Sequence, residues 1–342
     1  MARCIDVHSH FVPAPVLACL QRDGARYRTP VQVRDDGKLF VVTPERPYGP
    51  IGPGFHDLDV RKRYMAEHGI VRQVLAPPPF LFYYWIDARV GMEIIHTVND
   101  AMAEITNSDP AFACLGTIPM QDAPAAMRES ERIKSLGLSG IEIGSNIDGM
   151  ELDDERLWPV YEAIESLGLP LLVHPNNVVG SDRMRDFHLQ NLVGFPCDST
   201  LAAARLIFAG VLDRFPDLKI CLGQAGGFLP YIVGRLDQGF TARAECRRSG
   251  CSKPSDYLRR FHYDTIIHAS RPLAFLIESV GADRVMFGSD FPFDMRSLLP
   301  ASALDANGSL THEQSEQIRF GTSEQFFGLR SSAPMAPHPI PG

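Results

Sequence analysis

Short apolar segments rich in β-branched residues recur along the chain, and most are followed by a stretch with apolar residues at three- and four-residue spacing. The short segments are typical of buried strands, and the longer stretches are typical of amphipathic helices. Eight segments have the strand pattern. They are Cys4–Val7, Val71–Ala76, Ala113–Thr117, Gly140–Ile143, Leu171–Val173, Lys219–Leu222, Tyr263–Ile267 and Arg284–Phe287.

Helices are predicted between these strands. A strand that is followed by a helix and then by another strand usually pairs in parallel with it. Eight such repeats predict an α/β fold, a (β/α)8 TIM barrel whose functional residues follow the carboxyl ends of the strands. The clearest helical stretches are Val90–Thr106, Pro124–Ser135, Leu157–Leu167, Thr200–Ala209 and Ala274–Val280.

One segment departs from the repeat. Residues from about 13 to 56 contain two strand-like stretches, Tyr27–Val33 and Lys38–Val42, and then the Gly- and Pro-rich stretch Arg46–Gly54. We therefore expect a small β insertion after the first strand, which would wall or cap a pocket at the barrel mouth. Residues 1–330 should form one barrel domain, and the Pro-rich residues 331–342 should form a flexible tail.

Composition narrows the classes of partner. The 342 residues are 45% hydrophobic and carry a formal net charge of −8, with no block of Lys or Arg. This balance argues against nucleic-acid and membrane surfaces and favours a small-molecule partner. No apolar run is long enough to span a membrane, and Asp6, His8 and His10 stand where a secretory signal would be apolar. With seven cysteines and no C-x-x-C pair, we expect buried thiols and a cytoplasmic protein.

Metal-ligating residue types follow three of the predicted strands. His8 and His10 end the first strand, His174 follows the fifth and Asp290 follows the eighth. Singly, each has a plainer explanation, a hydrogen-bonded histidine or a helix N-cap aspartate. Because the carboxyl ends of barrel strands meet at one mouth, the four together predict a site for Zn²⁺ or a similar first-row divalent ion.

These residues and several longer motifs resemble the amidohydrolase superfamily, and within it the aminocarboxymuconate semialdehyde decarboxylase-like branch (amidohydrolase 2). The similarity extends from about Ile5 to Leu329. The branch also contains non-oxidative decarboxylases of aromatic acids, hydratases and hydrolases. The matching motifs are Val60–Gly69, Phe82–Trp85, Leu115–Met120, Gly140–Gly144, Val173–Pro175, Asp182–Met184, Val211–Pro216, Gly234–Arg235 and Gly288–Phe293.

The resemblance implies a cofactor, a ligand set and an assembly. It implies that His8, His10, His174 and Asp290 hold one Zn²⁺ ion per subunit, with Mn²⁺ and Co²⁺ as the alternatives. It also implies that the barrels pair into a homodimer.

Substrate contacts are implied by the same resemblance. Trp85, Phe187 and Phe293 would correspond to aromatic walls of the pocket, although core packing explains Trp85 and Phe187 equally well. Arg235 matches an arginine that crosses the dimer interface to a substrate carboxylate, the alternative being a salt bridge with a nearby acid such as Asp237. A second family arginine resembles Arg46, for which a solvated loop position is the stronger alternative.

Strand 6 departs from the family pattern. The decarboxylases carry a His-Gly-Gly-Gly element where this chain has Gln224-Ala225-Gly226-Gly227, and a glutamine cannot titrate near neutral pH. Proton transfer should then fall to Asp290, with Gln224 positioning substrate by hydrogen bonds. His262 and His268 flank the seventh predicted strand and are further catalytic candidates if that strand stays regular.

Three functions remain open from the sequence. The first is a metal-dependent non-oxidative decarboxylase, a C–C lyase acting on a small aromatic or muconate-like carboxylic acid. The second is a metal-dependent hydrolase of an ester, lactone or amide in the same fold. The third is a catalytically idle paralogue that binds a ligand, which the intact set of metal-ligating residue types argues against.

Overall fold

The structure is a computed structural model and describes residues 3–247, 250–297, 304 and 310–329. Eight parallel strands form one sheet in the order β1-β5-β6-β7-β10-β11-β12-β13. Their bounds are β1 Cys4–His10, β5 Ile70–Ala76, β6 Phe112–Gly116, β7 Gly140–Gly144, β10 Leu171–His174, β11 Ile220–Leu222, β12 Phe261–Asp264 and β13 Val285–Met286.

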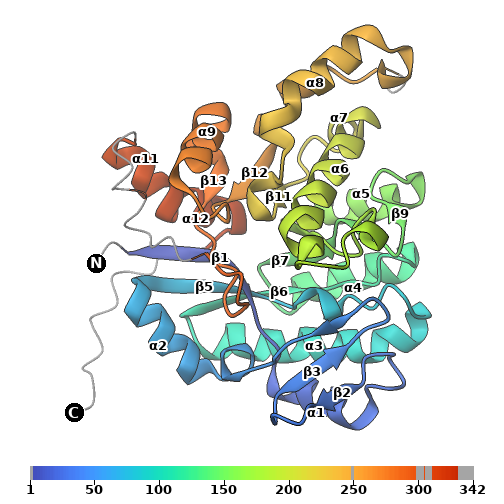
Figure 1. Ribbon diagram of the computed structural model, residues 1–342, viewed down its shortest axis with the longest axis vertical. Helices are drawn as coiled ribbons and strands as arrows, with labels where there is room; N and C mark the ends of the chain where they lie inside the picture. Colours follow the sequence, from blue (N-terminus) through green and yellow to red (C-terminus); the bar gives the residue numbers. More distant parts are fainter. Residues whose placement is uncertain (1–2, 248–249, 298–303, 305–309, 330–342) are drawn as a thin grey trace.

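The first and last strands close this sheet into a barrel. Val7 N donates to Phe287 O at 2.9 Å, and His10 N donates to Phe291 O at 2.7 Å. The chain that follows β13 therefore runs alongside β1, as Figure 1 shows at the centre of the molecule. All eight predicted strands are present, and the (β/α)8 barrel prediction is confirmed.

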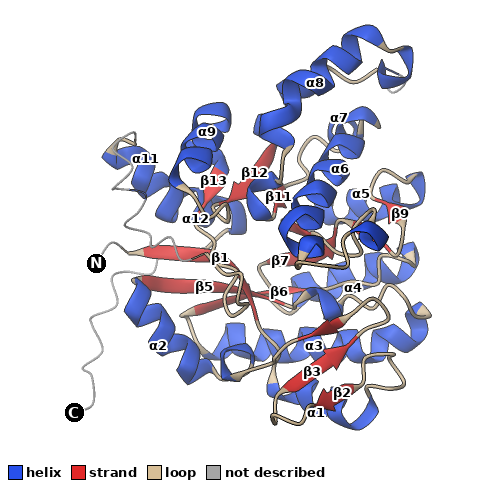
Figure 2. Ribbon diagram, in the orientation of Figure 1, coloured by secondary structure: helices blue, strands red, loops and turns tan. Residues whose placement is uncertain are grey.

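Helices surround the barrel and alternate with its strands (Figure 2). Several begin at an aspartate whose carboxylate accepts hydrogen bonds from the first turn, as Asp57, Asp87 and Asp122 do. The bounds are α2 Leu58–His68, α3 Ala88–Ser108, α4 Ala123–Ser135, α5 Trp158–Leu167, α6 Phe195–Phe208, α7 Val211–Arg214, α8 Leu229–Ala242, α9 Ser270–Val280, α11 His312–Glu316 and α12 Thr322–Phe327.

The segment after β1 contains a helix as well as the expected strands. Helix α1 (Ala14–Asp23) precedes a three-stranded antiparallel sheet of β2 (Val31–Val33), β3 (Leu39–Val42) and β4 (Pro47–Tyr48). Helix α1 was not predicted, because Pro13 and Pro15 at its start gave the segment a loop-like pattern. A second small hairpin, β8 (Asn146–Ile147) with β9 (Met150–Glu151), follows β7. The predicted tail, residues 331–342, lies outside the described residues.

A buried arginine ties this insertion to the barrel. The guanidinium of Arg61 on α2 donates to the carbonyl oxygens of His10 and Gly54, and to Gln73 Oε1 at 2.9 Å. Arg61 is fully buried, so these bonds replace the water that its charge would otherwise require. The end of β1 is therefore fixed from outside the barrel.

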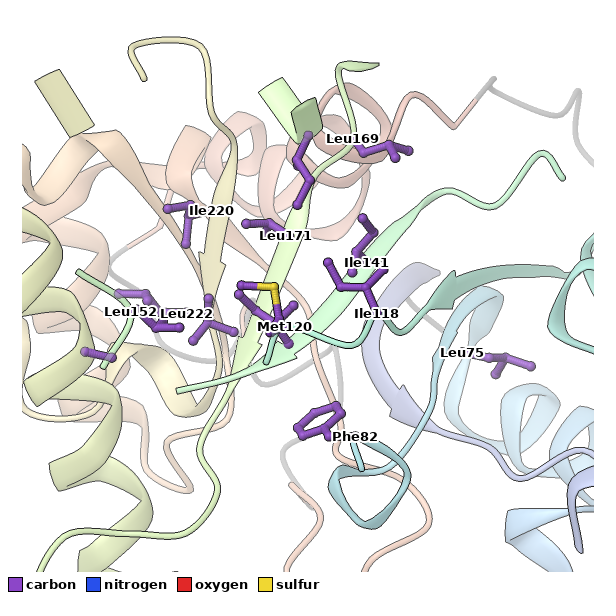
Figure 3. Close-up of a cluster of buried hydrophobic side chains, with 14 of the residues drawn as sticks. Leu75, Phe82, Ile118, Met120, Ile141, Leu152, Leu169, Leu171, Ile220 and Leu222 are labelled. Atoms are coloured by element: carbon purple, nitrogen blue, oxygen red, sulfur yellow. The ribbon is translucent and has the colours of Figure 1, made fainter. Parts of the chain in front are cut away.

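Apolar side chains pack on both faces of the barrel sheet. On the outer face, Ile141, Leu171 and Ile220 from neighbouring strands lie in one cluster (Figure 3), which also contains helix residues such as Ile133 and Ile164. A second cluster contains side chains from the other face of six of the barrel strands. It contains Ile5, Val7, Val74, Ala76, Ala113, Leu115, Leu172, Cys221 and Met286, together with Phe326, Phe327 and Leu329 from the C-terminal helical segment.

This second cluster is the barrel interior, since side chains from strands on opposite sides of a barrel meet only inside it. The interior is therefore a packed core along part of its length.

Among the described residues, no helix is both long enough and apolar enough to cross a membrane.

Candidate metal centre

The two histidines of β1 reach the barrel interior through an irregularity in the strand. Ile5 and Val7 belong to the inner apolar cluster, yet His8 and His10 also face inward, so the alternation changes after Val7. The pairing between β1 and β5 shifts register between Asp6 and Ser9, which is where this change occurs. The bulge thus converts the end of an apolar strand into a pair of inward-pointing imidazoles.

The four predicted ligands meet at one buried point. Their ligand atoms all lie within 4.8 Å of one another, and all four residues are buried. His8 Nε2 is 3.2 Å from His10 Nε2, and Asp290 Oδ1 is 3.2 Å from His10 Nε2 and 3.9 Å from His8 Nε2. The His174 ring lies edge-on to both, with centroids 5.2 Å from His8 and 5.1 Å from His10.

Two of the rings are held from the side that faces away from this point. His8 Nδ1 lies 2.6 Å from Asp264 Oδ2, and His174 Nδ1 lies 2.8 Å from the carbonyl oxygen of Pro175. A hydrogen bond at Nδ1 fixes the tautomer and leaves the Nε2 lone pair directed at the centre. His10 Nδ1 is 4.0 Å from Glu142 Oε1, which is too far for a hydrogen bond.

Burial and mutual repulsion set the protonation of these groups. Burial and the neighbouring His8 hold the pKa of His10 well below its ordinary value, and burial with His10 and His8 does the same for His174. Burial also opposes protonation of His8, but the hydrogen bond and charge of Asp264 outweigh it and raise the His8 pKa to about 9 in the metal-free protein. A metal ion that binds His8 Nε2 would displace this proton. Burial raises the pKa of Asp290.

Asp264 organises the backbone on one side of the centre. Besides His8, its carboxylate accepts hydrogen bonds from the backbone N–H groups of Gln224 at 3.0 Å and Ala225 at 2.7 Å. Gln224 and Ala225 have φ values of 49° and 54°, a left-handed conformation that is costly for residues other than glycine. The carboxylate of Asp264 therefore stabilises a strained turn that presents Gln224 to the centre.

Asp290 is held in the same kind of conformation. Its φ is 64°, and its N–H donates to the carbonyl oxygen of His8 at 2.8 Å. This bond ties the ligand after β13 directly to the ligand on β1. Backbone strain of this kind concentrates at functional sites, where the surrounding structure fixes one geometry.

A second buried carboxylate, that of Glu142 on β7, lies behind His10. Neither of its oxygens has a hydrogen-bond partner among the described residues, and burial raises its pKa well above the ordinary value. Glu142 is a charged residue type within the apolar strand Gly140–Gly144. The sequence therefore contained a signal for it, an acid in a buried strand, that we did not use. Asp264 was noted only as sharing the parity of His262 and His268 in the predicted strand Tyr263–Ile267, whereas β12 ends at Asp264, which lies beside His8.

The donor set fits a divalent metal ion. Three imidazole Nε2 atoms and one carboxylate oxygen surround the point, and Asp290 Oδ1 is buried without a hydrogen-bond partner among the described residues. Orphaned buried acceptors of this kind are costly unless an ion or water satisfies them. Neutral imidazoles with a carboxylate are suitable ligands for first-row divalent metals.

Two cavities open from this point. One, of about 110 Å³, is lined by residues that include Arg46, His174, Phe195, Asp290 and Phe293. The other, of about 970 Å³, shares Phe195 and Asp290 with the first and runs outward between α8 and α9. Asp290 thus contacts both spaces, and a substrate in either one would touch it.

Two of the predicted substrate contacts line the smaller cavity. Phe293 packs edge-on against the His10 ring, with centroids 5.1 Å apart. Arg46 is half-buried rather than solvated, and its guanidinium lies over the rings of Tyr48 and Phe195 at 4.5 and 5.0 Å. The β insertion therefore delivers a cation to the wall of the pocket.

The other two predicted aromatic walls lie elsewhere. Trp85 packs against Tyr83, and its indole N–H donates to Tyr27 O at 3.2 Å, so it connects the insertion to the loop after β5. The Phe187 side chain is 85% exposed and lines neither cavity. The structure of the single chain therefore brings Phe293, but not Trp85 or Phe187, to the centre.

The remaining candidates are spread over three positions. Gln224 faces the centre, with its Nε2 atom 3.5 Å from His174 Nε2. His268 is exposed and lines the larger cavity together with Asp290. Arg235 is exposed on α8, and the Asp237 carboxylate that could have paired with it lies 3.4 Å from Lys253 Nζ instead.

His262 lies deeper in the barrel than the centre. It precedes Asp264 by two residues on β12, about 6.6 Å along the strand. Its ring packs against Phe326 of the inner apolar cluster, with centroids 4.5 Å apart, and Arg284 Nη1 is 3.4 Å from its Nε2. The predicted strand placed the histidine just before its start, whereas β12 begins at Phe261 and makes His262 a half-buried strand residue.

Comparison with known proteins agrees with this arrangement. The amidohydrolase family model matches residues 5–329. The chain is 32% identical over 328 residues to 2-amino-3-carboxymuconate-6-semialdehyde decarboxylase of Dictyostelium discoideum, a match that covers 95% of this chain and 91% of the relative.

Solved structures extend the likeness to three dimensions. The 5-carboxyvanillate decarboxylase of Sphingomonas paucimobilis is 28% identical, with a TM-score of 0.80 over 96% of this chain and 99% of that one. The dihydroxybenzoic acid decarboxylase of a Polaromonas species, solved with bound manganese and 2-nitroresorcinol, is 27% identical, with a TM-score of 0.78 over 97% and 98% of the two chains. The chain therefore belongs to the amidohydrolase family, in the branch of 2-amino-3-carboxymuconate-6-semialdehyde decarboxylase.

Proposed function

We propose that this protein is a metal-dependent non-oxidative decarboxylase of a small aromatic or muconate-like carboxylic acid. The observation that carries the proposal is the convergence of three imidazole Nε2 atoms and Asp290 Oδ1 beside a cavity that also contains Arg46. A divalent metal ion bound there would supply a Lewis acid that polarises the substrate's oxygen atoms. Zn²⁺ is the proposed native ion, with Mn²⁺ and Co²⁺ as the alternatives.

The chain's own residues then bind the acid and move a proton. The Arg46 guanidinium is suited to pair with the substrate carboxylate, and Phe293 packs along the flat ring and excludes water. The bond between the substrate carbon and its carboxylate breaks, the electron pair stays on that carbon, and CO₂ leaves. A proton held at Asp290 then goes to the carbon.

Gln224 has a positioning task in this scheme. Its amide faces His174, and its Oε1 atom is buried without a partner among the described residues, so it can accept a hydrogen bond from a substrate hydroxyl or amine. A glutamine keeps that hydrogen-bond geometry over the whole pH range. The acid and base work of the family histidine is thus assigned to Asp290.

Product analysis in heavy water tests the proposal. Protein loaded separately with Zn²⁺ and with Mn²⁺ is given a panel of aromatic acids, lactones and esters. We expect CO₂ from an aromatic or muconate-like acid and one deuterium at the carbon that lost it. A new carboxylate from an ester or lactone would identify a hydrolase, and no product from any compound in the presence of bound metal would identify an idle paralogue.

We propose that the native assembly is a homodimer formed around α8. This helix projects from the barrel in Figure 1, and it carries the exposed Arg235 together with Tyr231, whose side chain is 82% exposed. Pairing would allow Arg235 to serve the neighbouring subunit's substrate, with an interface on the order of 2,000 Å². Light scattering at low concentration tests it, because a fully active monomer would exclude a role for Arg235 across an interface.

A further inference from the structure

A carboxyl group lies inside the barrel, next to the metal centre on the side of the apolar interior. Ile141 and Ile143 of β7 belong to the outer apolar cluster, so Glu142 between them points into the barrel. Glu142 pairs in register with Leu172 of β10, whose side chain belongs to the inner apolar cluster. The carboxyl group therefore lies at the level where the apolar interior ends and the metal centre begins.

Burial of this carboxyl group is costly in the metal-free protein. Glu142 is 0% exposed, and neither of its oxygens has a hydrogen-bond partner among the described residues. An apolar side chain would pack at this position without that cost, as Leu115 and Leu172 do on the two neighbouring strands. A buried polar group without a partner therefore needs an explanation other than the stability of the fold.

The atom that faces Glu142 is also without a partner. His10 Nδ1 lies 4.0 Å from Glu142 Oε1, is buried, and makes no hydrogen bond within the described part of the chain. A histidine that binds a metal ion through Nε2 has its proton on Nδ1, so Nδ1 becomes a buried donor. Both the charged and the protonated form of a carboxyl group have an oxygen that can accept this bond.

The other two imidazoles show which contact the third one lacks. His8 Nδ1 lies 2.6 Å from Asp264 Oδ2, and His174 Nδ1 lies 2.8 Å from the carbonyl oxygen of Pro175. Metal-binding histidines usually donate their second N–H to such an acceptor, which fixes the tautomer and the orientation of the ring. A movement of about 1 Å would bring the carboxyl group of Glu142 within hydrogen-bond distance of the third ring.

We infer that Glu142 is a positioning residue of the metal centre, which accepts a hydrogen bond from His10 Nδ1 when the ion is bound and so fixes the third imidazole. Glu142 acts through His10 and touches neither the substrate nor the ion. The inference rests on the metal site of the proposed function but not on the reaction that occurs there. It explains why an acid stands where packing alone would favour an apolar residue.

Two variants separate the hydrogen bond from packing. Glu142→Leu removes the acceptor and fills the space with an apolar side chain, whereas Glu142→Gln keeps an oxygen that can accept from Nδ1. In competition with a chelator, without substrate, Glu142→Leu should lower the affinity for Zn²⁺ about 10- to 100-fold. Glu142→Gln should keep part of the affinity that Glu142→Leu loses. Leu172→Ala is the control, because it disturbs the same level of the interior and leaves the acceptor in place, and it should keep the native affinity.

The stability of the metal-free protein gives a second readout. Because Glu142→Leu removes a buried group without a partner, its urea midpoint should lie above that of the native protein, whereas Leu172→Ala should lower the midpoint. A residue that only supports the fold would not combine a gain in stability with a loss of Zn²⁺ affinity. A crystal structure of the zinc-loaded native protein measures the contact itself, and we expect about 3 Å between His10 Nδ1 and one oxygen of Glu142.

The outcomes separate this inference from the proposed reaction. Native Zn²⁺ affinity in Glu142→Leu, equal losses in Glu142→Leu and Glu142→Gln, or a lowered urea midpoint in Glu142→Leu would overturn it even if CO₂ is released from an acid. A separation that stays at 4.0 Å in the zinc-loaded protein would also overturn it. A graded loss of Zn²⁺ affinity would support it even if product analysis identified a hydrolase or an idle paralogue.

Discussion

The two ends of the barrel interior are built from the same strands but contain opposite kinds of side chain. Toward the amino ends of the strands, Leu172 and Met286 pack with Phe326 in a fully apolar cluster. At the carboxyl ends, His174 and Asp264 belong to a buried polar group with orphaned acceptors. On β10, Leu172 belongs to the inner apolar cluster, and His174, two residues later, belongs to the metal centre.

This difference shows that the two ends of the barrel interior contribute oppositely to the stability of the fold. Buried apolar side chains at the amino end stabilise the fold, whereas unpartnered buried polar groups at the carboxyl end cost free energy in the metal-free protein. Substitutions at the two ends should therefore separate metal binding from folding.

Removal of a ligand should abolish metal binding while the fold persists. In His174→Ala and in Asp290→Ala one of four converging ligands is lost, and we expect metal content to fall to near zero after dialysis, with no measurable turnover. Elemental analysis and circular dichroism of each purified variant check this. Full metal occupancy in both variants would show that these residues are not the ligands.

Shortening an apolar side chain near the amino ends of the barrel strands should lower stability but leave metal binding unchanged. Leu172 is fully buried in the inner cluster, and Leu172→Ala should lower the free energy of unfolding by about 2–5 kcal/mol through lost contacts and a residual cavity. Metal stoichiometry of the folded protein should not change. Urea denaturation and metal analysis are measured on the same samples, and a loss of metal comparable to that of His174→Ala would break the comparison.

Most of this contrast could be predicted from the sequence. Barrel strands such as β6 and β10 are buried along their whole length, and burial on both faces gives a continuous apolar pattern that is visible without a structure. The four metal-ligating residues follow such runs directly, so the barrel fold alone was enough to predict their meeting. Burial of both strand faces is a local property, and local properties can be read from a sequence.

The contacts around the ligands could not be predicted in this way. Asp264 is separated from His8 by 256 positions, and only closure of the barrel brings the two side chains together. Arg46 was interpreted as a loop residue because nothing nearby in the sequence shows that the insertion folds back over Phe195. Phe187 and Trp85 belong to loops, whose course depends on distant packing rather than on periodicity.

Loss of the outer partner of His8 should weaken metal binding without abolishing it. In the native protein, the two oxygens of Asp264 accept hydrogen bonds from His8 and from the N–H groups of Gln224 and Ala225. Asp264→Asn keeps the shape of the side chain but has only one oxygen to accept these bonds. We expect metal affinity to fall about 10- to 100-fold. Competition with a chelator measures it, and unchanged affinity would mean that Asp264 serves the backbone turn alone.

A titratable group at position 224 should change pH dependence more than rate. Gln224→His places an imidazole beside His174, and we expect kcat/KM at neutral pH to stay within about tenfold of the native value while a new ionisation appears in its pH profile. Profiles of both proteins on the substrate identified by product analysis check this. Robust decarboxylation by the variant alone would mean that the native chain is inactive.

The smallest effect is expected at His262, the polar residue that lies among the apolar ones. Burial, with Arg284 nearby, lowers its pKa from an ordinary 6.5 to about 4 in the folded protein. Above pH 6.5 the ring is neutral in both states. Between pH 6.5 and 4 the unfolded chain binds a proton that the folded chain does not, so stability falls as the pH falls, by about 1 kcal/mol between pH 6 and pH 5 from this group.

His262→Leu removes that ionisation and keeps an apolar contact with Phe326. We expect the free energy of unfolding to decline less steeply below pH 6.5, by the same amount of about 1 kcal/mol per pH unit, with metal affinity and turnover at neutral pH unchanged. Urea denaturation at several pH values measures how steeply the free energy of unfolding changes with pH. Asp264→Asn, two residues further along β12, is measured for comparison. A large loss of turnover in His262→Leu would mean that this histidine contributes to catalysis. The catalytic part of the barrel interior would then extend further toward the amino ends of the strands.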